Sequence, residues 1–183
     1  MAYYYFDFRD VEKQNRYGLL SSLLFQLYTQ LDSYDDVLSK LYPDNADRTR
    51  KPTSCALTKC MKDMLSLPGQ GQIYIVVDAL DECPNVSGTP SAREEVLGLI
   101  KELVDMKLPN VHICVASRPE IDIRAVLESL TSLQVSVHDE KGQKEDIIKY
   151  IKSVVHSDKA MRKWKKVDQE FVIDMLSEKA GGM

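Results

Sequence analysis

The fold is decided by the stretch Gln72-Ile73-Tyr74-Ile75-Val76-Val77-Asp78-Ala79-Leu80-Asp81-Glu82-Cys83. Its run of β-branched and aromatic residues at 73–77 follows a glycine-containing turn and ends in acid, a pattern that predicts a strand buried on both faces. Parallel sheets bind their ligands at the carboxyl ends of strands. There, Asp78 can reach a Mg²⁺ ion or its water shell, while Asp81 and Glu82 can orient a water or sense a γ-phosphate. The alternative interpretation is a buried strand whose acids only cap the following loop.

The composition limits the class of protein. The chain has 183 residues, 44% of them hydrophobic, which is enough for one core and too few for two independent domains. Its net charge of -4 provides no overall positive field, so no nucleic-acid partner is expected. The four cysteines form no CxxC pair, which favours reduced thiols in a cytoplasmic protein. No basic leader and no apolar run of membrane length occur, so no membrane partner is expected either.

Strand and helix patterns alternate along most of the chain. Apolar and aromatic runs predict strands at 2–8, 73–77, 111–116 and 133–137, and three- and four-residue spacings predict helices at 16–31, 34–42, 53–67, 121–130 and from Ser91 onward. The helix at Ser91 begins with the spacing of a capping box. This alternation predicts an α/β fold with a parallel sheet and right-handed crossovers. From Lys144 the pattern is purely helical and predicts the start of a helical domain.

A second functional signal directly follows the expected strand at 111–116. Ser117, Arg118 and Pro119 stand at the point where this strand should end. A guanidinium suits phosphate because its fork can donate two parallel hydrogen bonds. Taken alone, an arginine before a helix is more often an ordinary surface residue. Because one helix separates this strand from the strand that ends at Asp78, we expect Arg118 and Asp78 to lie at the same edge of the sheet.

The two motifs together resemble those of NACHT-type signalling NTPases of the STAND class, especially the fungal nephrocystin-3-like N-terminal family. The form hhhhD-A-L-D-E-C resembles a Walker B motif, and strand-Ser-Arg-Pro resembles the sensor 1 position. The resemblance implies a three-layer α/β/α P-loop NTPase-like core over residues 1–140 and the start of a helical extension over 141–183. It also implies a cytoplasmic molecular switch whose protein partners act through oligomerisation and through repeat domains outside this chain.

The resemblance also implies roles for individual residues. Asp78 would hold the Mg²⁺ of bound ATP or GTP, and Asp81 and Glu82 would be the catalytic acids that polarise or position water. Ser117 and Arg118 would contact the nucleotide, with Arg118 sensing the γ-phosphate. The rival interpretation, from a different class of function, is a catalytically inactive interaction scaffold with the same fold.

The sequence departs from the family pattern at the phosphate-binding loop. A P-loop needs G-x-x-x-x-G-K-[ST], because backbone amides and a lysine must surround the β- and γ-phosphates. The sequence contains no Gly-Lys dipeptide. In the resembled family this loop and its strand precede the strand that here begins at Ala2, so truncation is the expected explanation. In the resembled family, the missing strand that carries the P-loop lies between the strands expected here at 111–116 and 133–137. A chain without it should bind nucleotide no better than roughly millimolar and be inactive alone.

A basic segment surrounds the single tryptophan, Trp164. Its cations are Lys159, Arg162, Lys163, Lys165 and Lys166. Such a segment could bind nucleic acid with one stacking ring. The commoner arrangement, and the one expected, is a solvated basic face whose tryptophan packs its edge inward. The three histidines are dispersed and show no metal-ligand spacing, and Ser117 has no neighbouring histidine that could activate it as a nucleophile.

Overall fold

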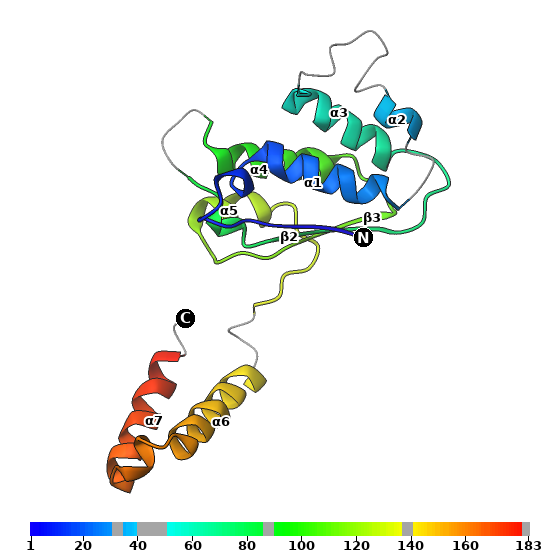
Figure 1. Ribbon diagram of the computed structural model, residues 1–183. Coiled ribbons are helices and arrows are strands. Elements are labelled where there is room, and N and C mark those ends of the chain that lie inside the picture. Colours follow the sequence, from blue (N-terminus) through cyan, green and yellow to red (C-terminus); the bar gives the residue numbers. More distant parts are fainter. Residues whose placement is uncertain (31–34, 40–50, 86–89, 137–140, 181–183) are drawn as a thin grey trace. The chain divides into compact units, whose positions relative to one another are not determined.

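The computed structural model describes residues 1–30, 35–39, 51–85, 90–136 and 141–180 (Figure 1). The chain divides into two compact units, Met1–Thr131 (unit 1) and Ser132–Met183 (unit 2). All the described strands belong to unit 1, and the described part of unit 2 contains a pair of long helices with a short connection.

The elements of unit 1 alternate as the sequence predicts. They are β1 (Ala2–Tyr5), η1 (Val11–Lys13), α1 (Arg16–Tyr28), α2 (Asp35–Ser39), α3 (Ser54–Leu65), β2 (Ile73–Asp78), η3 (Leu80–Glu82), α4 (Ala92–Asp105), β3 (Val111–Val115) and α5 (Ile121–Leu127). The expected helices and the first three strands are confirmed, with ends that differ by up to a few residues. The outer parts of the helix expected at 34–42, and most of the loop that follows it, lie outside the described residues.

The sheet has the order β1-β2-β3, and both pairs of neighbouring strands are parallel. Tyr5 of β1 is opposite Asp78 of β2, and Val77 of β2 is opposite Val115 of β3. The three carboxyl ends are therefore aligned at one edge of the sheet. This confirms the α/β class with a parallel sheet and places the loops that follow the strands next to one another.

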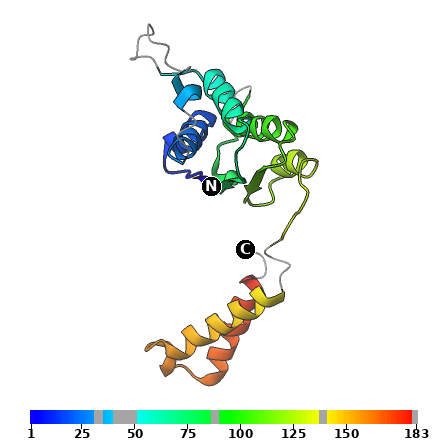
Figure 2. The same ribbon diagram turned by 90° about the vertical axis from the view of Figure 1, so that its right-hand side faces the viewer.

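One face of the sheet is covered by helices α1 and α4, and α3 packs on α1 on the side away from the sheet (Figures 1 and 2). The central strand contributes Ile73, Ile75 and Val77, all buried. Helix α1 buries a leucine face consisting of Leu19, Leu20, Leu23, Leu24 and Leu27. Fully burying one leucine side chain contributes about 2 kcal/mol, so this layer supplies much of the free energy that holds the sheet together.

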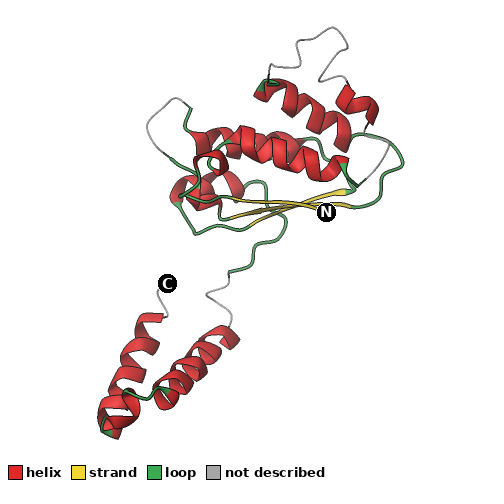
Figure 3. Cartoon of the chain, in the orientation of Figure 1, coloured by secondary structure: helices red, strands yellow, loops and turns green. Residues whose placement is uncertain are grey.

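The other face of the sheet is open in the described part of unit 1 (Figure 3). Its side chains include Tyr3, Tyr5 and Tyr74, which are 56%, 47% and 49% exposed. The expectation that residues 73–77 form a strand buried on both faces is therefore wrong. A five-residue apolar run does not distinguish a strand covered on both sides from one that alternates Ile and Val inward with Tyr outward. The expected three-layer arrangement is likewise not seen, because no described helix of unit 1 covers this open face.

The prediction of a strand at 133–137 is also wrong for the residues of this range that the structure describes. Residues 133–136 form neither strand nor helix, and residue 137 lies outside the described part. Leu133 and Val135 are 78% and 65% exposed. Alternation predicts a strand only where a layer covers the apolar side, and these two side chains have no such cover.

The outer edge of β1 is capped by side chains of α1 and of the turn that follows it. Gln26 accepts a hydrogen bond from the Tyr3 amide at 3.0 Å and donates one to the Tyr3 carbonyl at 2.7 Å. Gln30 does the same for the amino group and carbonyl of Met1, at 2.7 and 2.9 Å. Two glutamines thus make the bonds that a neighbouring strand would make, which protects this edge from pairing with another chain.

Two glycines in helices should respond in opposite ways to alanine. A Cβ at Gly18 would lie 2.3 Å from the carbonyl oxygen of Glu12 and 3.0 Å from the Tyr4 hydroxyl, so Gly18→Ala should destabilise the protein by about 2 kcal/mol. A Cβ at Gly98 meets nothing within 4 Å, so Gly98→Ala should stabilise it by about 1 kcal/mol. Urea unfolding of both variants tests this. Shifts of the same sign would show that helix propensity, rather than contact with η1, decides the outcome.

Unit 2 consists of α6 (Lys141–Ser157), η5 (Met161–Lys163) and α7 (Lys166–Ala180). The two long helices pack against each other and bury Val155 and Ile173. This agrees with the purely helical pattern after Lys144. None of the described helices combines the length and the apolar character needed to cross a membrane.

Candidate functional site

The residues singled out by the sequence lie where β2 and β3 end. Beyond the strands the ladder continues, because the Ala116 amide donates to the Val77 carbonyl at 2.9 Å and the Leu80 amide donates to the Ala116 carbonyl at 3.2 Å. These bonds hold the loop after β3 against the loop after β2. Asp78 and Arg118, which are far apart in sequence, are thereby placed at the same edge of the sheet.

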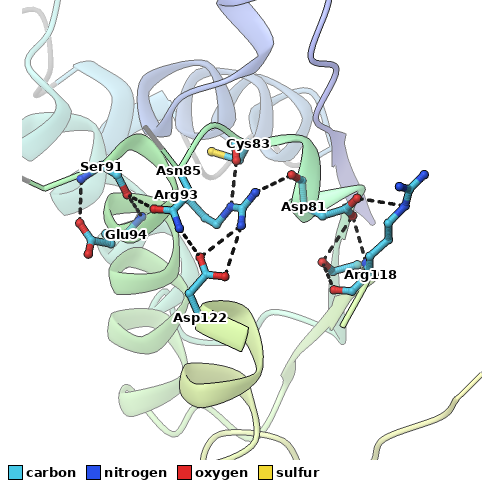
Figure 4. Close-up of polar contacts among 9 residues, drawn as sticks. Asp81, Cys83, Asn85, Ser91, Arg93, Glu94, Arg118 and Asp122 are labelled. Carbon is cyan, nitrogen blue, oxygen red and sulfur yellow. Dashed lines mark hydrogen bonds and ion pairs between the residues drawn. The ribbon is translucent and has the colours of Figure 1, made fainter. Parts of the chain in front are cut away.

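Asp81 and Arg118 are in direct contact across this edge. The Arg118 amide donates to Asp81 Oδ1 at 3.1 Å, and Arg118 Nε lies 3.5 Å from Asp81 Oδ2 (Figure 4). The Ser117 hydroxyl donates to the same Oδ1 at 3.4 Å. The Asp81 side chain is 13% exposed and that of Arg118 is 83% exposed. Asp81 therefore fixes the start of the loop after β3, while most of the guanidinium faces solvent, where it can meet an anion.

Glu82 makes the corresponding connection to β1. Its Oε2 accepts a hydrogen bond from the Phe8 amide at 3.1 Å. The Phe6 amide donates to the Asp78 carbonyl at 3.1 Å, which extends the β1–β2 ladder by one residue. The two adjacent acids therefore hold different neighbours: Asp81 holds the loop after β3, and Glu82 holds the loop after β1. In this structure both carboxylates position backbone.

Asp78 has a different environment. Its carboxylate is exposed, and Oδ1 accepts a hydrogen bond from the Ala79 amide at 2.8 Å. Ala79 adopts the left-handed conformation with φ of 54°, which turns the chain sharply after β2. No group of three or more His, Cys, Asp or Glu side chains suited to a metal ion occurs among the described residues. A single exposed carboxylate fits Mg²⁺, which is commonly held by one or two carboxylates together with substrate phosphates and water.

Arg93 supports the site and was not identified from the sequence. It is 7% exposed, and its guanidinium reaches three partners. Nε donates to the Cys83 carbonyl at 2.9 Å, Nη2 donates to the Asp81 carbonyl at 2.6 Å, and Nη1 lies 3.2 Å from Asp122 Oδ2 (Figure 4). The residue stands three and four positions before the buried Val96 and Leu97. Helical spacing therefore places it on the buried face of α4, and that was the signal available in the sequence.

Further hydrogen bonds lock the start of α4 to this network. Ser91 and Glu94 form the expected capping box, with the Glu94 amide donating to Ser91 Oγ and the Ser91 amide donating to Glu94 Oε2. Asn85 donates to Asp122 Oδ2 at 3.0 Å and accepts from Ser91 Oγ at 3.1 Å. The ends of β2, α4 and α5 are thus joined by one polar cluster (Figure 4).

The carboxyl end of β1 adds further charges to the same edge. Arg9 donates to Asp7 through its side chain and its backbone amide, and these bonds lower the pKa of Asp7 to about 2. Lys13 Nζ donates to the Tyr5 hydroxyl at 2.5 Å and lies 4.1 Å from the centre of that ring. Cations and carboxylates are therefore interleaved along the edge, and Arg118 differs from Arg9 in being only loosely paired.

A family model for the N-terminal region of nephrocystin 3 matches residues 1–118. The chain belongs to this family. The matched range covers more than half of the chain and ends at Arg118, so it contains Asp78, Asp81, Glu82 and Ser117. Comparisons with curated proteins and with solved structures give no match.

Two of the four thiols of this nephrocystin 3 N-terminal family member are buried beside the site or in the core. Burial raises the pKa of Cys83 to about 11 and that of Cys60 to about 11, while Cys55 and Cys114 are exposed. Burial also raises the pKa of Tyr4 to about 12. Between pH 9 and 12 the unfolded chain therefore releases protons that the folded chain retains, so folding stability should fall as the pH rises through this window.

We predict that a thiol reagent at mildly alkaline pH modifies Cys55 and Cys114 quickly and the two buried thiols only after unfolding, because the thiolate is the reactive form. Counting released chromophore with and without denaturant measures this. A Cys83→Ser variant should leave the fast phase unchanged. Fast modification of Cys83 in the folded protein would contradict the enclosure of the thiol, whose Sγ lies 3.4 Å from the Gln14 carbonyl oxygen.

Proposed function

We propose that this protein is part of a nucleotide-dependent switch of the NACHT type, in which the edge carrying Asp78, Asp81 and Arg118 faces the Mg²⁺ and γ-phosphate of ATP or GTP. The observation that carries this proposal is the contact between Asp81 and Arg118. It joins the ends of two adjacent parallel strands and leaves the arginine fork exposed. A guanidinium held in this way can respond to the presence or loss of a terminal phosphate.

The residues of the edge would divide the work. Asp78 would offer its exposed carboxylate to Mg²⁺, and a bound Mg²⁺ would offset charge on the β- and γ-phosphate oxygens. Asp81 would hold Arg118 and Ser117 in position rather than act as a free base, since both its oxygens already have partners. Glu82 would keep the β1 loop in place through the Phe8 amide and leave Oε1 to orient a water.

The absence of a P-loop from this sequence limits what the chain can do alone. Without a Gly-Lys dipeptide the sequence provides no P-loop, and most phosphate-directed binding free energy is missing. We therefore expect affinity for Mg·ATP of roughly millimolar at best and no measurable turnover. Hydrolysis, oligomerisation, repeat-domain partners and a cytoplasmic location are proposed for an intact switch protein that supplies this loop.

The open face of the sheet favours a second candidate, a catalytically inactive interaction scaffold. Tyr3, Tyr5 and Tyr74 are each about half exposed on neighbouring strands. Tyrosine is enriched at protein interfaces because it combines a large apolar ring with a hydroxyl. In a scaffold this face would bind a partner, and the edge with Asp78 would be structural only.

Titration of the isotope-labelled chain with Mg·ATP and Mg·ADP, followed by amide NMR shifts, separates the two functions. A switch predicts shifts at Ser117 and Arg118 with millimolar ATP, and weaker shifts with ADP. Loss of a charge-assisted hydrogen bond costs about tenfold in affinity, so Arg118→Ala should remove the preference for ATP. Arg9→Ala is the matched control, because Arg9 lies at the same edge but is bound by Asp7. If neither nucleotide shifts these amides, the scaffold is the better function.

A further inference from the structure

The connection between α6 and α7 concentrates positive charge. Five cations occupy eight consecutive positions: Lys159, Arg162, Lys163, Lys165 and Lys166. No acid interrupts them, although the chain as a whole has a net charge of -4. All five residues are exposed, and none forms an ion pair with a described residue. No described carboxylate therefore pairs directly with these five cations.

Large apolar side chains are exposed beside these cations. Trp164 is 46% exposed, Val167 is 74% exposed and Phe171 is 64% exposed. Val167 and Phe171 stand one turn apart, on the same face of α7. The sequence favoured a tryptophan that packs its edge inward, but about half of the Trp164 surface remains open. The five cations and these three side chains together form what we call the basic-aromatic turn, which stays net positive although Asp168 and Glu170 lie between Val167 and Phe171.

The backbone of this turn is held in place by local hydrogen bonds. Asp158 Oδ1 accepts from the amides of Ala160 and Met161, at 2.8 and 3.0 Å. Arg162 Nε donates to the His156 carbonyl at 3.0 Å. Gln169 Nε2 donates to the Met161 carbonyl at 2.7 Å and so ties α7 back to η5. A turn fixed in this way loses little conformational entropy when it binds a surface.

We propose that the basic-aromatic turn binds the surface of a membrane that contains anionic phospholipids. Lysine and arginine near such a surface are attracted by its negative potential, and tryptophan is favoured at the level of the headgroups. Val167 and Phe171 can enter the adjoining apolar boundary, as the apolar face of an interfacial helix does. The turn lies at the end of the helix pair opposite to the start of α6 and the end of α7 (Figure 1).

A single-stranded nucleic acid is the main alternative ligand. It would use the cations for phosphates and Trp164 for stacking. Such a strand has no apolar layer to receive Val167 and Phe171, which are more exposed than the tryptophan. The aliphatic and phenyl groups beside the indole therefore favour lipid.

Trp164 is the only tryptophan in the chain, so its fluorescence reports on this turn alone. The full chain is mixed with vesicles of phosphatidylcholine, with or without phosphatidylserine, and tested for co-sedimentation. We expect binding with a blue shift of the emission only when phosphatidylserine is present, and release at high salt because ions screen exposed charges. The double variant Lys163→Glu, Lys165→Glu should bind at least about thirtyfold more weakly, because the attraction of two lysines is lost and each glutamate adds repulsion.

Two further variants make the result specific. The pair Lys149→Glu, Lys152→Glu makes the same change of charge on α6 and should keep most of the binding. Phe171→Ser changes no charge on an exposed side chain and should still weaken vesicle binding, with helicity checked by circular dichroism. The proposal is overturned if anionic vesicles do not bind at low salt, if neutral vesicles bind equally well, or if the two double variants behave alike. An unaffected Phe171→Ser variant, together with quenching by a single-stranded oligonucleotide, would assign the turn to nucleic acid.

Discussion

Arg93→Met should lower the free energy of unfolding by about 3 kcal/mol. Methionine replaces the buried stem of the side chain but donates no hydrogen bond. The carbonyls of Cys83 and Asp81 would then lose a donor, and Asp122 would keep Asn85 but lose its charged partner at 3.2 Å. Buried groups without partners cost more than the bond itself is worth, which is why a large effect is expected. Urea unfolding followed by circular dichroism measures it.

Arg124→Met is the matched control for this prediction. Arg124 forms an ion pair with Glu128 on α5, but both side chains are about half exposed. Exposed pairs of this kind contribute well under about 1 kcal/mol, so the control should remain close to the parent protein. Equal effects for the two arginine variants would show that the loop after β2 does not depend on Arg93. The proposed positioning of Asp81 would then lose its support.

The strand order at the site could be expected from the sequence because it depends on few rules. The sequence has an apolar run followed by acids, then one helix, and then a second apolar run followed by Ser-Arg-Pro. Two neighbouring strands joined by one helix are parallel, so their carboxyl ends share an edge of the sheet. That arrangement brings Asp78, Asp81 and Arg118 to the same edge, where the structure adds the contact between Asp81 and Arg118. Helix starts were also accessible where side chains cap them, as at Ser91.

Other features depended on information that the sequence pattern does not carry. Whether Tyr74 faces solvent is decided by the presence of a second layer, and the run 73–77 looks the same in either case. The Leu133 to Val137 pattern has the spacing of a strand, but the described part has no cover for it. The partners of Arg93 come from three separate segments, so its position on the buried face of α4 could be expected but its role could not.

Replacement by alanine should show that, of the two aspartates at the end of β2 and just beyond it, Asp81 is structural and Asp78 is not. Asp81→Ala should lower the free energy of unfolding by about 2 kcal/mol, because it removes the acceptor for the Arg118 amide and the Ser117 hydroxyl from a largely enclosed place. Asp78→Ala should change it by less than about 1 kcal/mol. Its carboxylate is exposed, and water can replace its bond to the Ala79 amide.

Hydrogen exchange at single amides gives this comparison a local measurement. In Asp81→Ala the Arg118 amide loses its acceptor at 3.1 Å and should exchange much faster, whereas in Asp78→Ala it should be unchanged. Asp81→Asn provides the intermediate case, since an amide oxygen can still accept from Arg118 and Ser117 but the ion pair with the guanidinium is lost. If Asp81→Asn is as unstable as Asp81→Ala, the charge at position 81 matters more than the hydrogen bonds. The ion pair with Arg118, rather than the hydrogen bonds from Arg118 and Ser117, would then hold the loop after β3 in place.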